Sequence, residues 1–174
     1  MERHRYGVGE YKYFARPMPP IVEELRIAMY RELAATANRW SERMRSRDSY
    51  PASLAEFLKI CAVHGQTKPT PLILRYEQGG YNCLHQDLYG DLVFPFQVVT
   101  CLSRPDVEFT GGELLLVEQQ PRAQSVGRVA HLEQGEAAVI TTCYRPVKGT
   151  RGYYRTNMRH GVSPILSGER YTLG

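Results

Sequence analysis

The stretch "PLILRYEQGGYNCLHQDLYG", from Pro71 to Gly90, decides the fold class of this chain. A short apolar run ends in a Gly-Gly turn, and a second short run leads from that turn to a histidine. Short runs bounded by glycine in this way predict two β-strands joined by a tight turn. Similar runs follow at regular intervals, namely "FPFQVVTCLS", "GELLLVE", "GRVAHL", "EAAVITT", "YYRTNMRHGV" and "RYTLG".

The region 70–174 therefore predicts about eight strands and a mainly β fold. No helix-length segment separates these runs, so a sandwich or barrel is favoured over alternating strands and helices. The most loop-like stretch of the region is "RPVKGTRG". The sequence stops four residues after Arg170, which indicates a truncated last strand and an exposed sheet edge.

The segment 1–69 is predicted to supply helices that cover one outer face of the strands. A first helix is indicated in "MPPIVEELRIAMYRELAATANRWSERM", where prolines stand only at the start and Leu25, Met29 and Leu33 recur every four residues. A second helix is indicated in "SLAEFLKICAVHG", with Ser53 as its N-cap and a glycine as its stop signal.

The composition fits one soluble domain over residues 1–174. The chain has a net charge of +4 and no apolar run of about 18 residues that could span a membrane. Charged residues stand at the N-terminus where a signal peptide would carry its apolar segment, so a cytoplasmic location is expected. The four cysteines form no CxxC pair, which favours reduced thiols over a zinc knuckle or a redox motif.

A candidate metal site begins with His85 and Asp87, which stand two residues apart in a strand-like stretch. Residues two apart in a strand point to the same face, so both side chains can aim at one point. His160 lies in another predicted strand and supplies a third ligand. Two histidines and one carboxylate form the facial triad of non-haem Fe(II) oxygenases, which leaves positions open for cosubstrate and O2. The remaining histidines lack partners at ligand spacing: His4, His64 and His131.

An arginine follows the third ligand at a distance that suits an anion site. Arg170 stands ten residues beyond His160 and is predicted to open the last strand. Its planar guanidinium can bind a carboxylate through two hydrogen bonds. The structural alternatives are a surface ion pair with Glu169 for Arg170, and a turn in which Asp87 caps backbone amides.

The "HQD" motif, the distant histidine and the arginine ten residues further on resemble the 2-oxoglutarate and Fe(II)-dependent dioxygenase superfamily. The resemblance covers the β region and implies a double-stranded β-helix, or jelly roll, as the catalytic core. It implies that His85, Asp87 and His160 bind Fe(II) and that Arg170 binds the distal carboxylate of 2-oxoglutarate. With O2 as the second cosubstrate, 2-oxoglutarate would be decarboxylated to succinate while a C–H bond of the substrate is hydroxylated.

Two branches of the superfamily share these motifs. "YEQGGYNCLHQD" resembles the alkylation-repair demethylases, which implies a place for Tyr76 beside 2-oxoglutarate, although a strand aromatic in the core is the structural alternative. "FTGGELLLVE" and the ten-residue spacing resemble the prolyl hydroxylases. The whole set, with "LHQDLYGD" and "RHGVSPILSGER", also resembles a bacterial family of oxygenases described as acting on alkylated DNA.

The segment 145–159 interleaves basic residues with tyrosines in "RPVKGTRGYYR". This composition is typical of surfaces that neutralise phosphates and stack bases, and equally of a solvated loop. Alkylated nucleic acid is therefore a candidate partner beside 2-oxoglutarate.

The leading functional hypothesis is a dioxygenase that hydroxylates a C–H bond, with oxidative demethylation of alkylated nucleic acid as one outcome. A prolyl-hydroxylase-like enzyme or a small-molecule hydroxylase would use the same iron site. A cupin-type metal enzyme would have no use for 2-oxoglutarate, and a jelly-roll binding module would carry out no catalysis.

Overall fold

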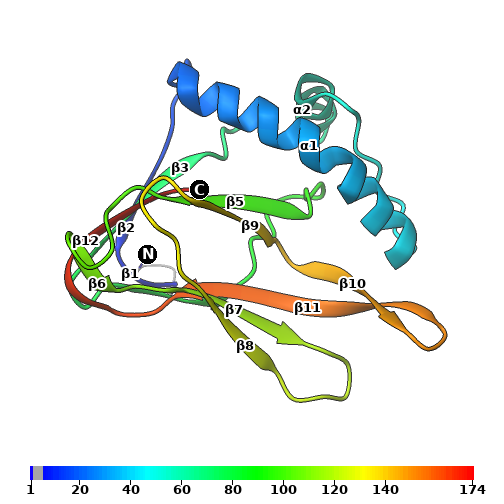
Figure 1. The fold of residues 1–174 in the computed structure, drawn as a ribbon. Coiled ribbons are helices and arrows are strands. Elements are labelled where there is room, and N and C mark those ends of the chain that lie inside the picture. The colour runs from blue at the N-terminus through cyan, green and yellow to red at the C-terminus, as the bar shows by residue number, and fades with distance from the viewer. Residues whose placement is uncertain (2–5) are drawn as a thin grey trace.

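The computed structural model describes residue 1 and residues 6–174 of the chain (Figure 1). His4 lies outside the described residues. Two helices and twelve strands are present in the described part, and the strands form two antiparallel sheets that face each other. The prediction of a mainly β fold is confirmed, with more strands than the sequence indicated.

Each sheet has six strands. The β11 sheet runs in the order β1 (Gly7–Val8), β4 (Tyr81–His85), β11 (Gly152–Val162), β7 (Leu114–Gln119) and β8 (Val126–Ala130), and β10 (Tyr144–Gly149) also pairs with β11. The β12 sheet runs in the order β2 (Glu10–Tyr13), β3 (Leu72–Glu77), β12 (Ile165–Leu173), β5 (Phe96–Cys101) and β9 (Ala137–Thr141), and β6 (Phe109–Gly111) also pairs with β12.

Two stretches differ from the prediction. The residues before the first helix are not helical cover: they form β1, which pairs with β4, and β2, which pairs with β3. The stretch "RPVKGTRG", predicted as a loop, is mostly strand β10 and its turn into β11. Such short strands carry little periodic signal of their own, and pairing with a longer partner stabilises them.

The last strand also differs from the prediction. β12 begins at Ile165 instead of Arg170, which puts Arg170 in mid-strand opposite Tyr76. β12 lies between β3 and β5 in the sheet order and also pairs with β6. It therefore does not form the exposed sheet edge that the sequence indicated.

The two predicted helices are α1 (Pro20–Met44) and α2 (Leu54–Val63), and they lie over the outer side of the β12 sheet (Figure 1). The predicted N-cap of α2 is confirmed, because the Ser53 hydroxyl oxygen accepts a hydrogen bond from the Glu56 N–H at 3.2 Å. The predicted apolar stripe of α1 is wrong at Leu25, which is 38% exposed. The side chains that α1 buries are Val22, Tyr30, Ala34, Ala37 and Ser41.

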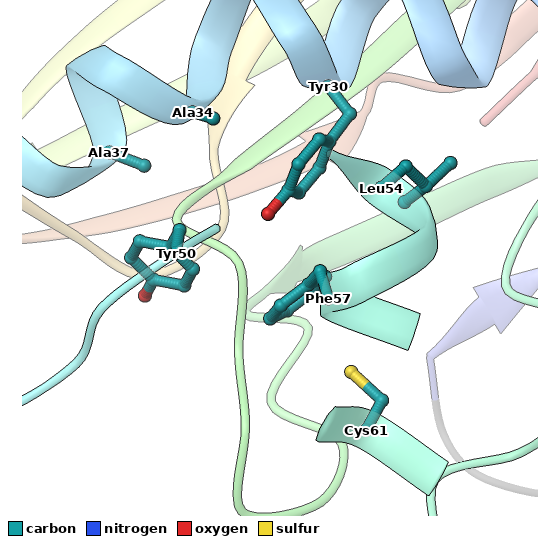
Figure 2. Close-up of a cluster of buried hydrophobic side chains, with 7 residues drawn as sticks. All are labelled: Tyr30, Ala34, Ala37, Tyr50, Leu54, Phe57 and Cys61. Atoms are coloured by element: carbon teal, nitrogen blue, oxygen red, sulfur yellow. The ribbon is translucent and has the colours of Figure 1, made fainter. Parts of the chain in front are cut away.

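An aromatic core fixes the helices to the sheet (Figure 2). The Tyr30 ring stacks on Phe57 with ring centroids 5.5 Å apart, and Phe94 packs against both rings. Small residues on α1 let the rings approach the helix closely. The buried members of this cluster are Tyr30, Ala34, Ala37, Tyr50, Leu54, Phe57 and Cys61.

A second core cluster lies between the two sheets and consists of Tyr76, Cys101, Phe109, Val162 and Ile165. The four cysteines are free thiols, in agreement with the sequence analysis. Neither helix of the described residues is long and apolar enough to cross a membrane.

Candidate metal centre

Three predicted ligands meet between the sheets. His85 ends β4, Asp87 follows two residues later, and His160 lies on β11 directly opposite His85. The His85 Nε2 atom is 3.4 Å from Asp87 Oδ1, and the His160 Nε2 atom is 3.3 Å from Asp87 Oδ2. One ligand atom from each residue lies within 4.8 Å of the others.

These distances suit a single metal ion. Two ligands that each bind an ion at about 2.1 Å and at right angles stand about 3 Å apart. Two imidazoles and one carboxylate are also the ligand set of mononuclear non-haem Fe(II) sites. The residues present therefore fit the ion that the sequence suggested, and their role as ligands stays a prediction.

A β-bulge in β4 brings the first ligand into the interior. His160 pairs with His85, but Val162, two residues further along β11, pairs with Asn82, three residues back along β4. The extra residue on β4 shifts the alternation of its side chains, so both Asn82 and His85 lie on the inner face. Alternation in a regular strand would have turned one of these two side chains outward.

Neighbouring groups hold the ligands in orientation. The Nδ1 atom of His85 is 2.7 Å from the Cys83 carbonyl oxygen, so Nδ1–H donates to that carbonyl. In the metal-free protein a protonated Nε2 can donate to Asp87, and loss of that proton frees its lone pair for a metal. The Gln97 side-chain amide donates to Asp87 Oδ2 at 2.5 Å. The sequence analysis did not identify Gln97, because an amide on a different strand has no spacing relation to the motif.

Gln86, the middle residue of the "HQD" motif, holds the loop against β11. Its amide nitrogen donates to the carbonyl oxygens of Cys143 and Met158 at 3.0 and 2.8 Å, and to the Asn157 side-chain oxygen at 2.5 Å. Gln86 points away from the ligands and connects the segment that carries Asp87 to the strand that carries His160.

The electrostatics of the three residues favour an ionised carboxylate. Burial alone would raise the pKa of Asp87, but hydrogen bonds from His160, His85 and Gln97 outweigh it and hold that pKa well below its usual range. Burial would lower the pKa of His85, and its contacts with Asp87 and the Cys83 carbonyl raise it instead. A negative carboxylate is the form that binds a cation.

Arg170 and Tyr76 lie in the interior between the sheets. Both are buried, at 3% and 1% exposure. Burial raises the pKa of Tyr76 to about 12 and lowers the pKa of Arg170. The structure brings them together as opposite neighbours on β12 and β3. The Tyr76 hydroxyl oxygen accepts a hydrogen bond from the Asn82 amide at 3.4 Å and keeps its own proton free to donate.

Three buried polar atoms of the site have no hydrogen-bond partner among the described residues: Nη1 of Arg170, the side-chain oxygen of Asn82 and Nδ1 of His160. An unpaired buried guanidinium nitrogen is costly and suits an anion such as a carboxylate. Arg170 also lines a cavity of about 280 Å³ with Phe109, Glu113 and His131. The surface ion pair with Glu169 does not form, because the Glu169 carboxylate pairs with Arg75 instead.

The basic segment 145–159 forms most of a hairpin, made of β10 and β11, that extends from the strand carrying His160 (Figure 1). Lys148, Arg151, Arg155 and Arg159 are exposed. Arg145 differs from them, since its Nη2 contacts both carboxylate oxygens of the buried Glu118 at 2.8 and 2.7 Å. The hairpin therefore presents four exposed cations that make no ion pair within the described residues, of which Arg155 lies over the Tyr144 ring at 5.7 Å, and a fifth, Arg145, that is anchored.

Residues 9–174 match a family of oxygenases described as catalysing oxidative methylation of damaged DNA. The chain belongs to this family. Two uncharacterized proteins of Mycobacterium tuberculosis, from strains CDC 1551 / Oshkosh and H37Rv, are relatives of this oxygenase. Each is 45% identical over 175 residues, which cover 98% of this chain and 75% of the relative.

The fold of this oxygenase is similar to that of viral collagen prolyl hydroxylase from Paramecium Bursaria Chlorella virus-1, solved as a 2-oxoglutarate complex. The TM-score is 0.54 at 17% identity, and the match covers 98% of this chain and 78% of the viral one. The jelly-roll prediction is thereby confirmed. The family makes this chain an oxygenase and therefore an oxidoreductase, and its fold is shared with a prolyl hydroxylase solved with 2-oxoglutarate.

Proposed function

We propose that the chain is a 2-oxoglutarate- and Fe(II)-dependent dioxygenase that removes alkyl groups from nucleic acid by hydroxylating them. The observation that carries this proposal is the convergence of His85, Asp87 and His160 between the sheets, in an interior that also holds a buried arginine with an unpaired nitrogen. The description of the family, oxygenases acting on damaged DNA, supports the substrate class.

The side chains of this chain have separate tasks in the proposed reaction. His85, Asp87 and His160 hold Fe(II), and Gln97 keeps the Asp87 carboxylate in position. Arg170 binds the distal carboxylate of 2-oxoglutarate through its unpaired nitrogen. Bound Fe(II), with 2-oxoglutarate and O2, supplies the oxidising chemistry.

Tyr76 and Asn82 complete the cosubstrate side of the site. The Tyr76 hydroxyl can donate its proton to a carboxylate oxygen. The hydrogen bond that this hydroxyl accepts from the Asn82 amide fixes the direction of the O–H. The apolar residues around them, Cys101, Phe109 and Ile165, exclude water from this end of the barrel. A dry environment strengthens the hydrogen bonds that hold the cosubstrate.

Hydroxylation of a methyl group on a base nitrogen gives a product that releases formaldehyde and restores the base. Two exposed cations of the β10–β11 hairpin, Arg155 and Arg159, lie on the strand that carries His160, and Lys148 and Arg151 lie on β10 and in the turn; all four can neutralise phosphates. A base within a duplex would have to leave its stack to reach the metal, so single-stranded nucleic acid is the simpler substrate.

A peptide hydroxylase is the second candidate, favoured by the likeness in fold to a collagen prolyl hydroxylase and by the ten-residue spacing from His160 to Arg170. It would use the same iron site and would leave the hydroxyl group on the product. The two candidates differ in what they release.

One assay separates them. The full chain, supplied with Fe(II), 2-oxoglutarate and O2, is incubated with methylated single-stranded DNA, with methylated RNA and with a proline-rich peptide. We expect formaldehyde from a methylated nucleic acid and no hydroxyproline, and we expect Asp87→Ala to abolish both succinate and formaldehyde. Hydroxyproline formation without formaldehyde would overturn the nucleic-acid proposal in favour of the second candidate.

A further inference from the structure

Four tyrosines surround the candidate metal centre on its solvent side, and the proposed reaction as described so far uses none of them. We name them the tyrosine rim: Tyr6, Tyr11, Tyr13 and Tyr89. The Tyr6 ring packs edge-on against the His85 ring with centroids 5.2 Å apart. Tyr89 follows Asp87 by two residues and is 59% exposed.

Tyr11 and Tyr13 reach the same opening from the other sheet. They lie on β2 directly opposite Leu74 and Leu72 of β3, and directly opposed side chains share a sheet face. Leu74 packs against the core cluster between the sheets, so this face is the inner one. The two rings meet edge-on with centroids 5.7 Å apart.

These inward-facing rings are nevertheless open to solvent, at 44% for Tyr11 and 46% for Tyr13. β2 stands at the end of its sheet order, so the barrel is open where the two rings stand. Burial raises the pKa of Tyr13, and smaller contributions in the same direction come from Tyr11, Asp87 and Tyr6, as expected if these groups are neighbours. The rings thus line an entrance that leads to the ligand residues.

An entrance lined by tyrosine faces and edges suits a flat aromatic ring. Stacking of a nucleobase on an aromatic side chain is worth about 1–3 kcal/mol per base. Alkylation of a ring nitrogen of adenine or cytosine adds positive charge to the base, and tyrosine faces attract such cations. An alkylated base is therefore favoured over its unmodified form at this position.

The charge of the β10–β11 hairpin favours a polyanion as the rest of the ligand. The hairpin contains no acidic residue between Tyr144 and Val162. Arg155 and Arg159 alternate along β11 with the buried Thr156 and His160 and therefore face the outer side of the sheet, and Lys148 and Arg151 lie at the far end of the hairpin. These cations would complement phosphates further along a strand whose base enters the site. A proline-rich peptide offers nothing to pair with these cations.

We propose that the tyrosine rim is the binding site for an unpaired, cationic alkylated base of a single-stranded nucleic acid. The rim tyrosines would stack on this base and orient its alkyl group towards the metal centre. This inference rests on the proposed function and names the residues that select its substrate. Strands β1 and β2 would then have a role in substrate binding, because Tyr6 adjoins β1 and Tyr11 and Tyr13 lie on β2.

The test measures binding in the absence of metal, so that turnover plays no part. A short end-labelled oligodeoxynucleotide with one adenine methylated on its ring nitrogen N1, and the same strand with plain adenine, are titrated with the full chain in EDTA, and fluorescence anisotropy reports Kd. We expect Tyr11→Ala and Tyr13→Ala to weaken binding of the methylated strand by about tenfold each. Tyr13→Phe, which keeps the ring, should stay within about twofold of the wild type.

Tyr81→Ala is the matched control. Tyr81 precedes the inward-facing Asn82 on β4, lies outside the rim and is 37% exposed, so its loss should leave both affinities unchanged. Equal binding of the methylated strand by wild type, Tyr11→Ala and Tyr13→Ala would overturn the proposal. So would a failure of the wild type to bind the strand at all, or rim-dependent binding of a proline-rich peptide instead of it.

Failure of the rim is distinguishable from failure of the proposed function. Succinate formation from 2-oxoglutarate without any nucleic acid reports the iron site alone, and we expect it to be equal in wild type and in the control variant Tyr81→Ala. If wild type forms no succinate under any condition, the proposed function fails. If succinate forms but the rim variants bind the methylated strand as tightly as wild type, only the assignment of the rim as the base-binding site is wrong.

Discussion

His85 and His160 face each other across the β4–β11 pair, with ring centroids 4.4 Å apart and both Nε2 atoms turned towards the carboxylate of Asp87. Without a metal, the carboxylate lies close to both imidazoles. With a metal, the same three atoms would coordinate one ion, so metal binding needs little movement of the backbone. This preorganisation leads to the following predictions.

The first prediction concerns metal affinity. His85→Ala and His160→Ala each remove one of three ligands, and we expect either change to lower the affinity for Mn(II), used as an oxygen-stable substitute for Fe(II), by at least about 100-fold. Isothermal titration calorimetry of the chain measures it. His64→Ala, at an exposed histidine beyond α2, is the control and should bind as wild type.

The second prediction concerns the residue that orients the carboxylate. Gln97→Ala removes the hydrogen bond to Asp87 Oδ2 but leaves all three ligands, so Mn(II) affinity should fall by about 10–100-fold instead of being lost. Gln78→Ala, at an exposed glutamine between β3 and β4, is the control and should leave the Mn(II) affinity unchanged. An unchanged affinity in Gln97→Ala would mean that the position of Asp87 does not depend on Gln97.

The third prediction concerns the cosubstrate. Arg170→Met keeps the length of the side chain and removes the guanidinium, so 2-oxoglutarate should no longer raise the thermal unfolding temperature of the Mn(II)-loaded protein. Arg170→Lys should restore little of the effect, because an ammonium lacks the planar fork. Arg128→Met, at an exposed arginine on β8, should respond to 2-oxoglutarate as wild type does. A normal response in Arg170→Met would favour a metal enzyme without 2-oxoglutarate.

The fourth prediction concerns the pH dependence of folding in EDTA. The pKa of Asp87 is lowered in the folded protein. The Asp87 carboxylate therefore adds to the free energy of unfolding above the ordinary pKa of 3.8, and this stabilisation is lost as pH falls through the lowered pKa of the folded protein. The pKa of His85 is raised in the folded protein. The His85 imidazolium therefore adds to the free energy of unfolding below the ordinary pKa of 6.5, and this stabilisation is lost as pH rises through the raised pKa of the folded protein. Both residues stabilise the fold between the two ordinary pKa values.

Thermal unfolding from pH 3 to 8 checks this prediction. In EDTA, we expect the unfolding temperature of wild type to exceed that of Asp87→Asn by most between about pH 4 and 6.5. With saturating Mn(II) the advantage of wild type should instead grow above that range, because the metal requires neutral imidazoles. A difference between the two proteins that is flat with pH would contradict the pKa directions.

The sequence was sufficient to predict the mainly β fold and the three residues that the structure brings together. The "HQD" pattern marks His85 and Asp87, but Asp87 lies beyond the end of β4 and not in the same strand as the sequence analysis expected. Their neighbours were not predictable in this way. Gln97 and Asn82 carry common amides with no spacing relation to the motif, and Asn82 faces inward only because of a bulge.

The first residues of the chain were the least predictable part of the fold. β1 and β2 are short, contain little apolar periodicity and owe their structure to pairing with β4 and β3. For the same reason no pattern in the sequence indicated that Tyr11 and Tyr13 lie near the ligand residues. The buried side of α1 was misjudged at Leu25 because small residues, Ala34 and Ala37, face the aromatic cluster (Figure 2).

The central claim is that Fe(II) and 2-oxoglutarate bind together at the site formed by His85, Asp87, His160 and Arg170. Anaerobic calorimetric titration of 2-oxoglutarate into the full chain, with and without Fe(II), tests it most directly. We predict that Fe(II) tightens 2-oxoglutarate binding by about tenfold or more in wild type and has no effect in Asp87→Ala. Equal binding with and without Fe(II) in wild type, or no binding in either case, would contradict the account.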